Sequence, residues 1–522
     1  MGQGHKIQIL KSRPQIFLGL FFTFLSLVQF SDLSGAATQT AAEPIRIQIG
    51  GEPGSLDPTM AIDSYAFGIM RNVNEGLFVL DGKGSLQNGL VDSYEVSKDR
   101  LKYRFKLRTN ARWSDGKPVT ADDFIYGWSH ALDHATGSQN AEYLFAIKGS
   151  RDAFNGKKPL HLMGLTKVSP QEFVVDLEKP DPAFLEELTL PVAAPLRRDV
   201  FETGHRRWNF HFPTTGPFKI TAYDPSEKIE LEPNSYNEHP GKKKIIFRIL
   251  PEEVTAMNLF ESGYLDVIST VTPTEVARLR SAGLIQTFPS TTVFYFSFNV
   301  TKPPFNDPTW RKAVAGCVDR EGLTKALSGI FQATTSYLPE TLDGFLPFPK
   351  PSFQDAVDKV QAIKDKPRIE LDYGSSVFGR IATEKLQQDL KKKLGLEMTI
   401  VPMELKMLLG RLEADSPNMY LLGMSALFND PMNQFNAFAN KTSANFTRYN
   451  SPEFEKLTEQ ITTTSPGPAR LEEIHEAQRL LIEKDTVMIP MVLRLQVFGA
   501  SKALKGFQVN PYQVIQLNQL DK

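Results

Sequence analysis

Few residues of this chain have the types and spacing that catalysis or metal binding requires. His475 and Glu476 lie in a run with helical apolar spacing, but no second histidine follows four residues later, so the zinc-protease pattern is absent. The eight histidines are scattered, and Cys317 is the only cysteine, which excludes an intramolecular disulfide and a cysteine-based metal site. Neither a G-x-S-x-G nucleophile turn nor a phosphate-binding G-x-x-x-x-G-K-[ST] loop occurs. The sequence therefore predicts no enzymatic activity, bound metal or other cofactor.

Residues 102–128 predict a strand, a tight turn and a capped helix in that order. Basic and apolar side chains alternate over 102–108, which is the pattern of a half-buried strand. Asp, Gly and Pro within 113–118 indicate a turn. Thr120 then precedes an acidic first turn and the helical apolar spacing of 121–128, which predicts an N-cap followed by a helix.

Composition describes a soluble globular protein of more than one domain. At 522 residues the chain is too long for a single core and should divide into two or three domains. A hydrophobic fraction of 41 %, a charged fraction of 23 % and a mean hydropathy of −0.26 fit neither a disordered chain nor a polytopic membrane protein. The net charge of −1 excludes a strongly basic surface and a general role with nucleic acid. Cys317, Trp113 and Trp128 are predicted to be packing residues.

Residues 1–36 have the three parts of a secretory signal peptide. His5, Lys6, Lys11 and Arg13 form a basic region, 16–30 is an apolar run, and 34–36 are small residues. We expect cleavage near Ala36; the alternative is an uncleaved anchor, although the apolar run is slightly short of a membrane span. No cysteine near this end could carry a lipid, so the sequence predicts a secreted protein without a lipid anchor.

The sequence of 113–124, W-S-D-G-x-P-V-T-A-x-D-F, resembles the signature of the extracytoplasmic solute-binding proteins that deliver ligands to ABC importers of peptides and nickel. Further stretches resemble the motifs of this family in the same order along the chain: 52–58, 74–77, 214–218, 262–267, 304–320 and 449–457. Because this order is kept over more than 400 residues, the chain is identified as a member of the family.

The resemblance implies an α/β fold of the periplasmic-binding-protein type, with two lobes, a hinge, mixed sheets and an additional inserted domain. Lobe I would combine 43–74, 201–290 and 491–522, lobe II would be the inserted segment 75–200, and lobe III would be 291–490. The residue pattern of 366–401 independently predicts strand, helix and strand, a βαβ unit that calls for a mostly parallel sheet. In such sheets ligands bind outside the carboxyl ends of the strands.

In the peptide-binding branch of the family, the ligand lies extended like an additional strand, and an aspartate in G-W-x-A-D-Y-N-E-P binds its α-ammonium group. The corresponding stretch here is 423–431, which has Leu427 at the aspartate position. Other charged or aromatic positions of the family's site also carry aliphatic residues. The resemblance implies these ligand-binding residues: Ile62, Asp63, Ser64, Tyr65, Leu405, Leu421, Gly423, Met424, Ser425, Ala426, Leu427 and Phe428.

A closed cleft without an acid at position 427 should bind free-amino peptides poorly, because a buried unpaired charge costs about 2–5 kcal/mol. The alternative is that Asp63, Asp430 or another acid replaces the anchor and that the protein binds ordinary oligopeptides. For function, the resemblance implies a monomeric periplasmic receptor that delivers a peptide or other small solute to an inner-membrane ABC permease. The alternative is a member that has left transport, as a sensor or a chaperone-like binding protein with an apolar cleft.

Overall fold

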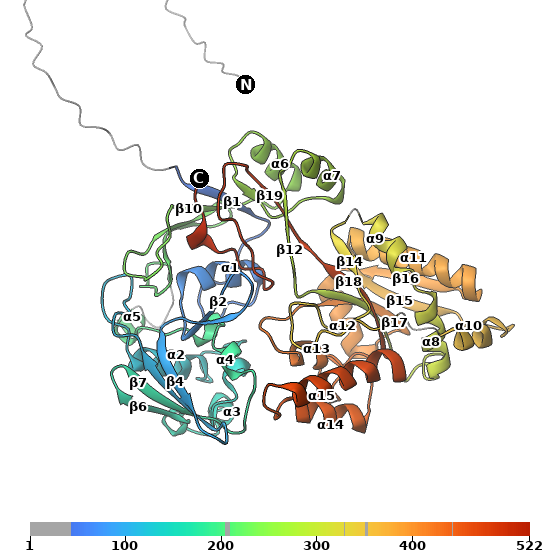
Figure 1. The fold of residues 1–522 in the computed structure, drawn as a ribbon, viewed down its shortest axis with the longest axis horizontal. Helices are drawn as coiled ribbons and strands as arrows, with labels where there is room; N and C mark the ends of the chain where they lie inside the picture. Colours follow the sequence, from blue (N-terminus) through green and yellow to red (C-terminus); the bar gives the residue numbers. More distant parts are fainter. Residues whose placement is uncertain (1–42, 204–208, 328, 350–352, 441) are drawn as a thin grey trace, which may run out of the picture. The chain divides into compact units, whose positions relative to one another are not determined.

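The computed structural model describes residues 43–203, 209–327, 329–349, 353–440 and 442–522, whose strands form four sheets (Figure 1). The predicted signal peptide lies outside these residues. The seven-stranded sheet has the order β12-β19-β11-β1-β10-β9-β8. Its strands are β1 (Ile45–Ile49), β8 (Phe218–Asp224), β9 (Lys228–Pro233), β10 (Ile245–Ile249), β11 (Val267–Ile268), β12 (Ile285–Phe288) and β19 (Gln496–Ala500). β1 runs parallel to β10 and β11, and the other pairings are antiparallel, so this sheet is mixed.

The six-stranded sheet has the order β14-β18-β13-β17-β15-β16. The predicted βαβ unit is confirmed, with parallel strands β15 and β16 on either side of α11. The mostly parallel sheet expected from that unit is wrong, because two of the five pairings are parallel and three are antiparallel. The βαβ unit sets the relative direction of β15 and β16 only. The strands β13 and β18 of the same sheet run antiparallel to each other. The elements are β13 (Val293–Phe298), β14 (Phe331–Ala333), β15 (Ile369–Gly374), α11 (Val377–Leu394), β16 (Met398–Met403), β17 (Met419–Met424) and β18 (Met488–Arg494).

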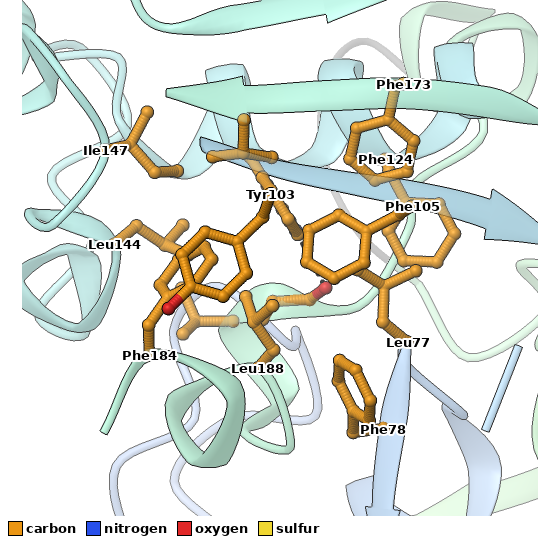
Figure 2. Packing of buried hydrophobic residues seen from close by; sticks show 14 of the residues in the cluster. Leu77, Phe78, Tyr103, Phe105, Phe124, Leu144, Ile147, Phe173, Phe184 and Leu188 are labelled. Carbon is orange, nitrogen blue, oxygen red and sulfur yellow. Dashed lines mark hydrogen bonds between the residues drawn. The ribbon is translucent and has the colours of Figure 1, made fainter. Parts of the chain in front are cut away.

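A third region contains a four-stranded antiparallel sheet of order β4-β5-β7-β6 and the small β2–β3 sheet. Figure 2 shows its core, in which Phe105 of β5 packs against Phe173 of β7, and Phe173 stacks on Phe124 of α2. Tyr103 of β5 packs against Phe184 in the same core. The alternation predicted over 102–108 is confirmed, because the apolar side chains of β5 are buried and the basic ones are exposed. The elements are β2 (Phe78–Leu80), β3 (Leu86–Asn88), β4 (Val91–Val96), β5 (Lys102–Leu107), α2 (Ala121–Ala131), β6 (Leu165–Ser169) and β7 (Glu172–Asp176).

The predicted N-cap of α2 is confirmed. Thr120 and Asp123 form a capping box, in which the Asp123 carboxylate accepts from the Thr120 backbone N–H at 2.8 Å. Trp113 Nε1 donates to the same carboxylate at 3.3 Å, and Trp128 Nε1 donates to the Ala193 carbonyl at 2.8 Å. Both tryptophans are buried in the same core, so their predicted packing role is confirmed.

Cys317 ends α8 (Pro308–Cys317) and is buried in the core of the six-stranded sheet, as predicted, where burial raises the pKa of its thiol to about 11. The other helices cover the sheets or connect their strands: α1 (Ser64–Val73), α3 (Ser150–Phe154), α4 (Phe184–Glu187), α5 (Arg198–Thr203), α6 (Glu253–Glu261), α7 (Pro273–Ser281), α9 (Arg320–Ala326), α10 (Gln354–Gln361), α12 (Leu405–Asp415), α13 (Met432–Phe435), α14 (Pro452–Ile461) and α15 (Pro468–Arg479). None of the helices in the described ranges is both long and apolar enough to cross a membrane.

The chain passes twice between the seven-stranded and six-stranded sheets. The first passage is 289–292, between β12 and β13, and the second is Leu495, between β18 and β19. The predicted lobe boundary after residue 290 falls in the first passage, and the boundary after residue 490 falls inside β18. The division into three lobes stays a prediction.

Candidate functional site

The carboxyl ends of the parallel strands carry the predicted site residues in both large sheets. Residues 62–65 follow β1 and lead into α1, Leu405 follows β16, and 425–428 follow β17. β1 is parallel to β10 and β11, and β17 and β16 are both parallel to β15. Loops at such ends are the usual place for ligands in α/β proteins.

A pocket of about 270 Å³ lies beside the start of α1 and the second passage between the sheets. Ser64 and Tyr65 line it, as do Thr270 after β11, Ser290 in the first passage and Arg494 at the end of β18. Two of the predicted residues, Ser64 and Tyr65, are therefore brought together in this pocket. Their role in binding stays a prediction.

The neighbouring residues of the same loop have other positions. Ile62 is 53 % exposed. Asp63 is the N-cap of α1, and its carboxylate accepts from the backbone N–H groups of Ala66 and Gly54, each at 2.8 Å. Because both oxygens of Asp63 already bind backbone donors, it is poorly suited to replace the missing ammonium anchor.

The end of β17 lies against the start of β13. Gly423 pairs with Phe294, and a Cβ atom on Gly423 would lie 2.6 Å from the Phe294 ring, so only glycine fits there. Met424 pairs with Val293 and is partly buried. Leu421 is buried in the core of the six-stranded sheet, whereas Leu405, at the start of α12, is 57 % exposed.

Ser425 and Ala426, which follow Met424, form hydrogen bonds with the first passage between the sheets. The hydroxyl groups of Ser425 and Thr292 are 2.7 Å apart. The backbone of Ala426 binds the Thr291 hydroxyl twice, accepting at 3.0 Å through its carbonyl and donating at 3.1 Å through its N–H. This part of the loop therefore lies next to the pocket but uses its polar groups internally.

Leu427 and Phe428 contact the region of the four-stranded sheet. Phe428 is buried in that core with its ring edge-to-face against Tyr143, and Leu427 packs against the same cluster. Arg71 Nη2, from α1, donates to the Leu427 carbonyl at 3.1 Å. Position 427 therefore lies where parts of all three sheet regions meet.

Asp430 is buried and forms an ion pair with the buried Arg470 of α15. Burial raises the pKa of Asp430, and Arg470 acts in the opposite direction. This carboxylate already has its cation, so it too is poorly suited to bind a ligand's ammonium group.

Sequence reasoning missed two charged residues near the predicted site. Glu186, on α4, has a pKa raised to about 7, chiefly by burial and then by Asp343 and Asp430. Its Oε2 atom is buried and has no hydrogen-bond partner among the described residues. Arg494 is the second, and it carried a usable signal, because it is the only charged residue in the apolar run 488–500.

No group of three or more His, Cys, Asp or Glu side chains in the described ranges is arranged to hold a metal ion. The predicted residues and Arg494 supply mainly aliphatic, hydroxyl and guanidinium groups to the candidate site.

Comparison with known proteins places these features in a family. Residues 85–446 match the family model described as "Bacterial extracellular solute-binding proteins, family 5 Middle". The oligopeptide-binding protein OppA of Bacillus subtilis is 29 % identical, with 88 % of this chain and 89 % of that protein covered. The probable deoxycholate-binding periplasmic protein YgiS of Escherichia coli is 25 % identical, with 90 % and 91 % covered.

Solved structures share the fold. The murein tripeptide binding protein MppA of Escherichia coli superposes with a TM-score of 0.75 at 24 % identity, with 92 % of this chain and 98 % of that chain covered. The Haemophilus influenzae OppA complex with the peptide RPPGFSPFR gives a TM-score of 0.73 at 23 % identity, with the same coverage. The predicted α/β fold of the periplasmic-binding-protein type, with mixed sheets, is confirmed.

Proposed function

This chain belongs to family 5 of the bacterial extracellular solute-binding proteins, and we propose that it binds a peptide or related small solute between its two large sheets and delivers it to an ABC permease. The observation that carries this proposal is the pocket at the carboxyl ends of β1 and β11, bordered by both passages between the sheets. A ligand at this position contacts both sheets, so its binding can favour one relative arrangement of them over another.

In this proposal, 43–74, 201–290 and 491–522 form lobe I, 75–200 form the inserted lobe II, and 291–490 form lobe III. Lobe III moves against the others when the ligand binds. The predicted residues of 62–65, Leu405, Leu421 and 423–428 would surround the ligand. Relatives named for binding peptides and other solutes favour this transport role over a sensor or a chaperone-like protein.

The aliphatic residue at position 427 bears on the class of ligand. Asp63 and Asp430 bind partners of their own, so neither offers a free carboxylate to an ammonium group. We therefore expect solutes without a free amino group to bind best. The alternative is that the protein binds ordinary oligopeptides and that Glu186 serves as the anchor for their ammonium group. Binding measurements on the wild-type protein can test this alternative.

Protein isolated from its native host without unfolding tests the proposal directly. Mass spectrometry of the solute that copurifies should identify a peptide or related small molecule. Adding that solute back to stripped protein should make the protein more compact in small-angle scattering. Deletion of the gene should abolish uptake of the same solute. Unchanged uptake in the deletion strain would contradict a transport role.

Processing and location are part of the proposal. The mature protein should begin close to Ala37, be released by osmotic shock without detergent, and be monomeric and without catalytic activity. N-terminal sequencing and light scattering of the released fraction check these points. Recovery in the membrane fraction with residues 1–30 intact would show an uncleaved anchor instead.

A further inference from the structure

Arg494 lies at the point where the chain leaves the six-stranded sheet. It is the last residue of β18, and its backbone N–H donates to the Thr292 carbonyl at 3.0 Å. Its side chain lines the 270 Å³ pocket from one side, and Tyr65 of α1 lines the same pocket. Arg494 is therefore at the junction of the two large sheets, beside the pocket.

Two buried arginines of this chain, Arg311 and Arg320, bind protein groups. Arg311 donates to the carbonyls of Phe305, Asp485 and Thr486. Arg320 donates to the Pro490 carbonyl at 2.7 Å. The Arg494 guanidinium, in contrast, has no hydrogen bond or ion pair with any residue in the described ranges. Its donors remain available to a molecule in the pocket.

The surroundings of Arg494 are poor in compensating charge. The Arg494 side chain is exposed to solvent; nearby protein atoms nevertheless lower the pKa of its guanidinium, and Tyr65 is the titratable group that acts in the opposite direction. The guanidinium presents planar, charged donors to an anion that enters the pocket.

Two other residues that line this pocket, Tyr65 and Thr270, have side chains close to Gly50. A Cβ atom on Gly50 would lie 3.0 Å from the Tyr65 hydroxyl and 3.1 Å from Thr270 Cγ2, so these side chains converge there. The Thr270 hydroxyl is a buried oxygen without a hydrogen-bond partner among the described residues. The pocket thus combines the Arg494 guanidinium with the Tyr65 hydroxyl group, which can donate to an anion.

We propose that Arg494, with Tyr65 across the pocket, binds the carboxylate group of the transported ligand. This inference rests on the proposed function and adds two points: the ligand carries a negative charge, and Arg494 binds that charge. The planar guanidinium presents paired donors that match the two oxygens of a carboxylate. Because Arg494 belongs to the six-stranded sheet and Tyr65 to α1 beside the seven-stranded sheet, a carboxylate between them also links the two.

The same chemistry can come from the carboxyl terminus of a peptide or from an apolar acid, and matched probes distinguish these sources. One pair is N-acetyl-trialanine and its C-terminal amide. The other is deoxycholate, below its micellar concentration, and its methyl ester. Each pair keeps the body of the probe and removes the negative charge. Binding is measured by calorimetry to the full mature protein after its native ligand has been removed.

Three variants accompany the wild type. Arg494→Gln removes the charge, and Arg494→Lys keeps the charge but not the paired donors. Arg380→Gln is the matched control, because Arg380 is an exposed arginine of α11 that lies outside the pocket and forms an ion pair with Glu384. Thermal unfolding of each variant verifies that it is folded.

In at least one pair, the wild type should bind the acid about tenfold more tightly than its neutral partner, the usual effect of a hydrogen bond to a charged group. Arg494→Gln should remove this preference for the acid and leave the affinity for the neutral partner within about twofold. Arg494→Lys should keep part of the preference, and Arg380→Gln should keep all of it. If Arg494→Gln retains the preference, or if the wild type prefers the acid in neither pair, the inference is wrong. Identification of the copurified solute and the uptake measurement do not depend on Arg494, so a transport role can stand while this inference fails.

Discussion

The loop 425–431 and the pocket at Arg494 lie next to each other, but their polar groups differ in whether they have partners within the protein. In the loop, Ser425 and Ala426 bind the first passage, the Leu427 carbonyl accepts from Arg71, and Asp430 is paired with Arg470. In the pocket, the guanidinium of Arg494 has no described partner. A residue whose charge is already matched inside the protein supports the fold, whereas an unmatched one is available to a ligand. Removing each charge in turn should separate these two roles.

The largest effect is expected at the buried ion pair of the loop. Arg470→Leu should lower the free energy of unfolding by about 3–5 kcal/mol, because it leaves Asp430 buried without its cation. Urea unfolding measures the loss. Adding Asp430→Asn to the same variant should restore most of it, since no uncompensated charge remains. A loss below about 1 kcal/mol in the single variant would contradict the structural role assigned to the pair.

Glu186 should make stability depend on pH. Its pKa is raised from 4.5 to about 7 in the folded protein, so the folded state keeps a proton that the unfolded state has lost between these values. The contribution is fully present below about pH 4.5 and is lost as the pH rises through 7, a change of about 3 kcal/mol. Glu186→Gln should flatten this part of the profile measured by urea unfolding. Parallel profiles for the variant and the wild type would mean that Glu186 has the same pKa in the folded and unfolded protein.

Leu427→Asp tests whether the lost anchor governs selectivity at the loop. The new carboxylate should improve binding of a free-amino tripeptide by about 1–3 kcal/mol, the usual value of a hydrogen bond to a charged group. N-acetylation of the peptide should abolish the gain and should matter little in the wild type. Calorimetry with two proteins and two peptides completes the cycle. If the wild type already loses more than about tenfold on acetylation, another acid serves as the anchor, and Glu186→Gln is the next variant to measure.

The smallest effect on stability is expected in the pocket. Arg494→Gln should change the free energy of unfolding by less than about 0.5 kcal/mol, because no described protein group loses a partner. The same urea titration used for Arg470→Leu compares the two arginines directly. A loss above about 1 kcal/mol would show that Arg494 supports the fold, and the contrast between loop and pocket would disappear.

Local patterns in the sequence predicted local structure well. The alternation of 102–108 and the N-cap at Thr120 depend on residues a few positions apart, so β5 and α2 follow from them. The βαβ unit over 366–401 was predicted for the same reason. The antiparallel half of its sheet was not, because β13 and β18 pair across almost 200 residues, and nothing local sets their direction.

The candidate site was only partly accessible to sequence reasoning. The family resemblance pointed to Ser64 and Tyr65, which line a pocket in the structure. It also left Asp430 as a possible anchor, because the sequence does not show that Asp430 pairs with Arg470, 40 residues away. Arg494 could have been singled out as the lone charge in an apolar run. That it lacks a partner is a property of the folded structure, and no spacing in the sequence expresses it.

The two passages between the sheets lie side by side. The Arg494 backbone N–H donates to the Thr292 carbonyl, and Gln496 Nε2 donates to the Pro289 carbonyl at 2.5 Å. Because the two passages are joined by these hydrogen bonds, we expect any movement of one large sheet against the other to bend both passages together. An extra residue inserted in one passage alone should then change the angle between the sheets.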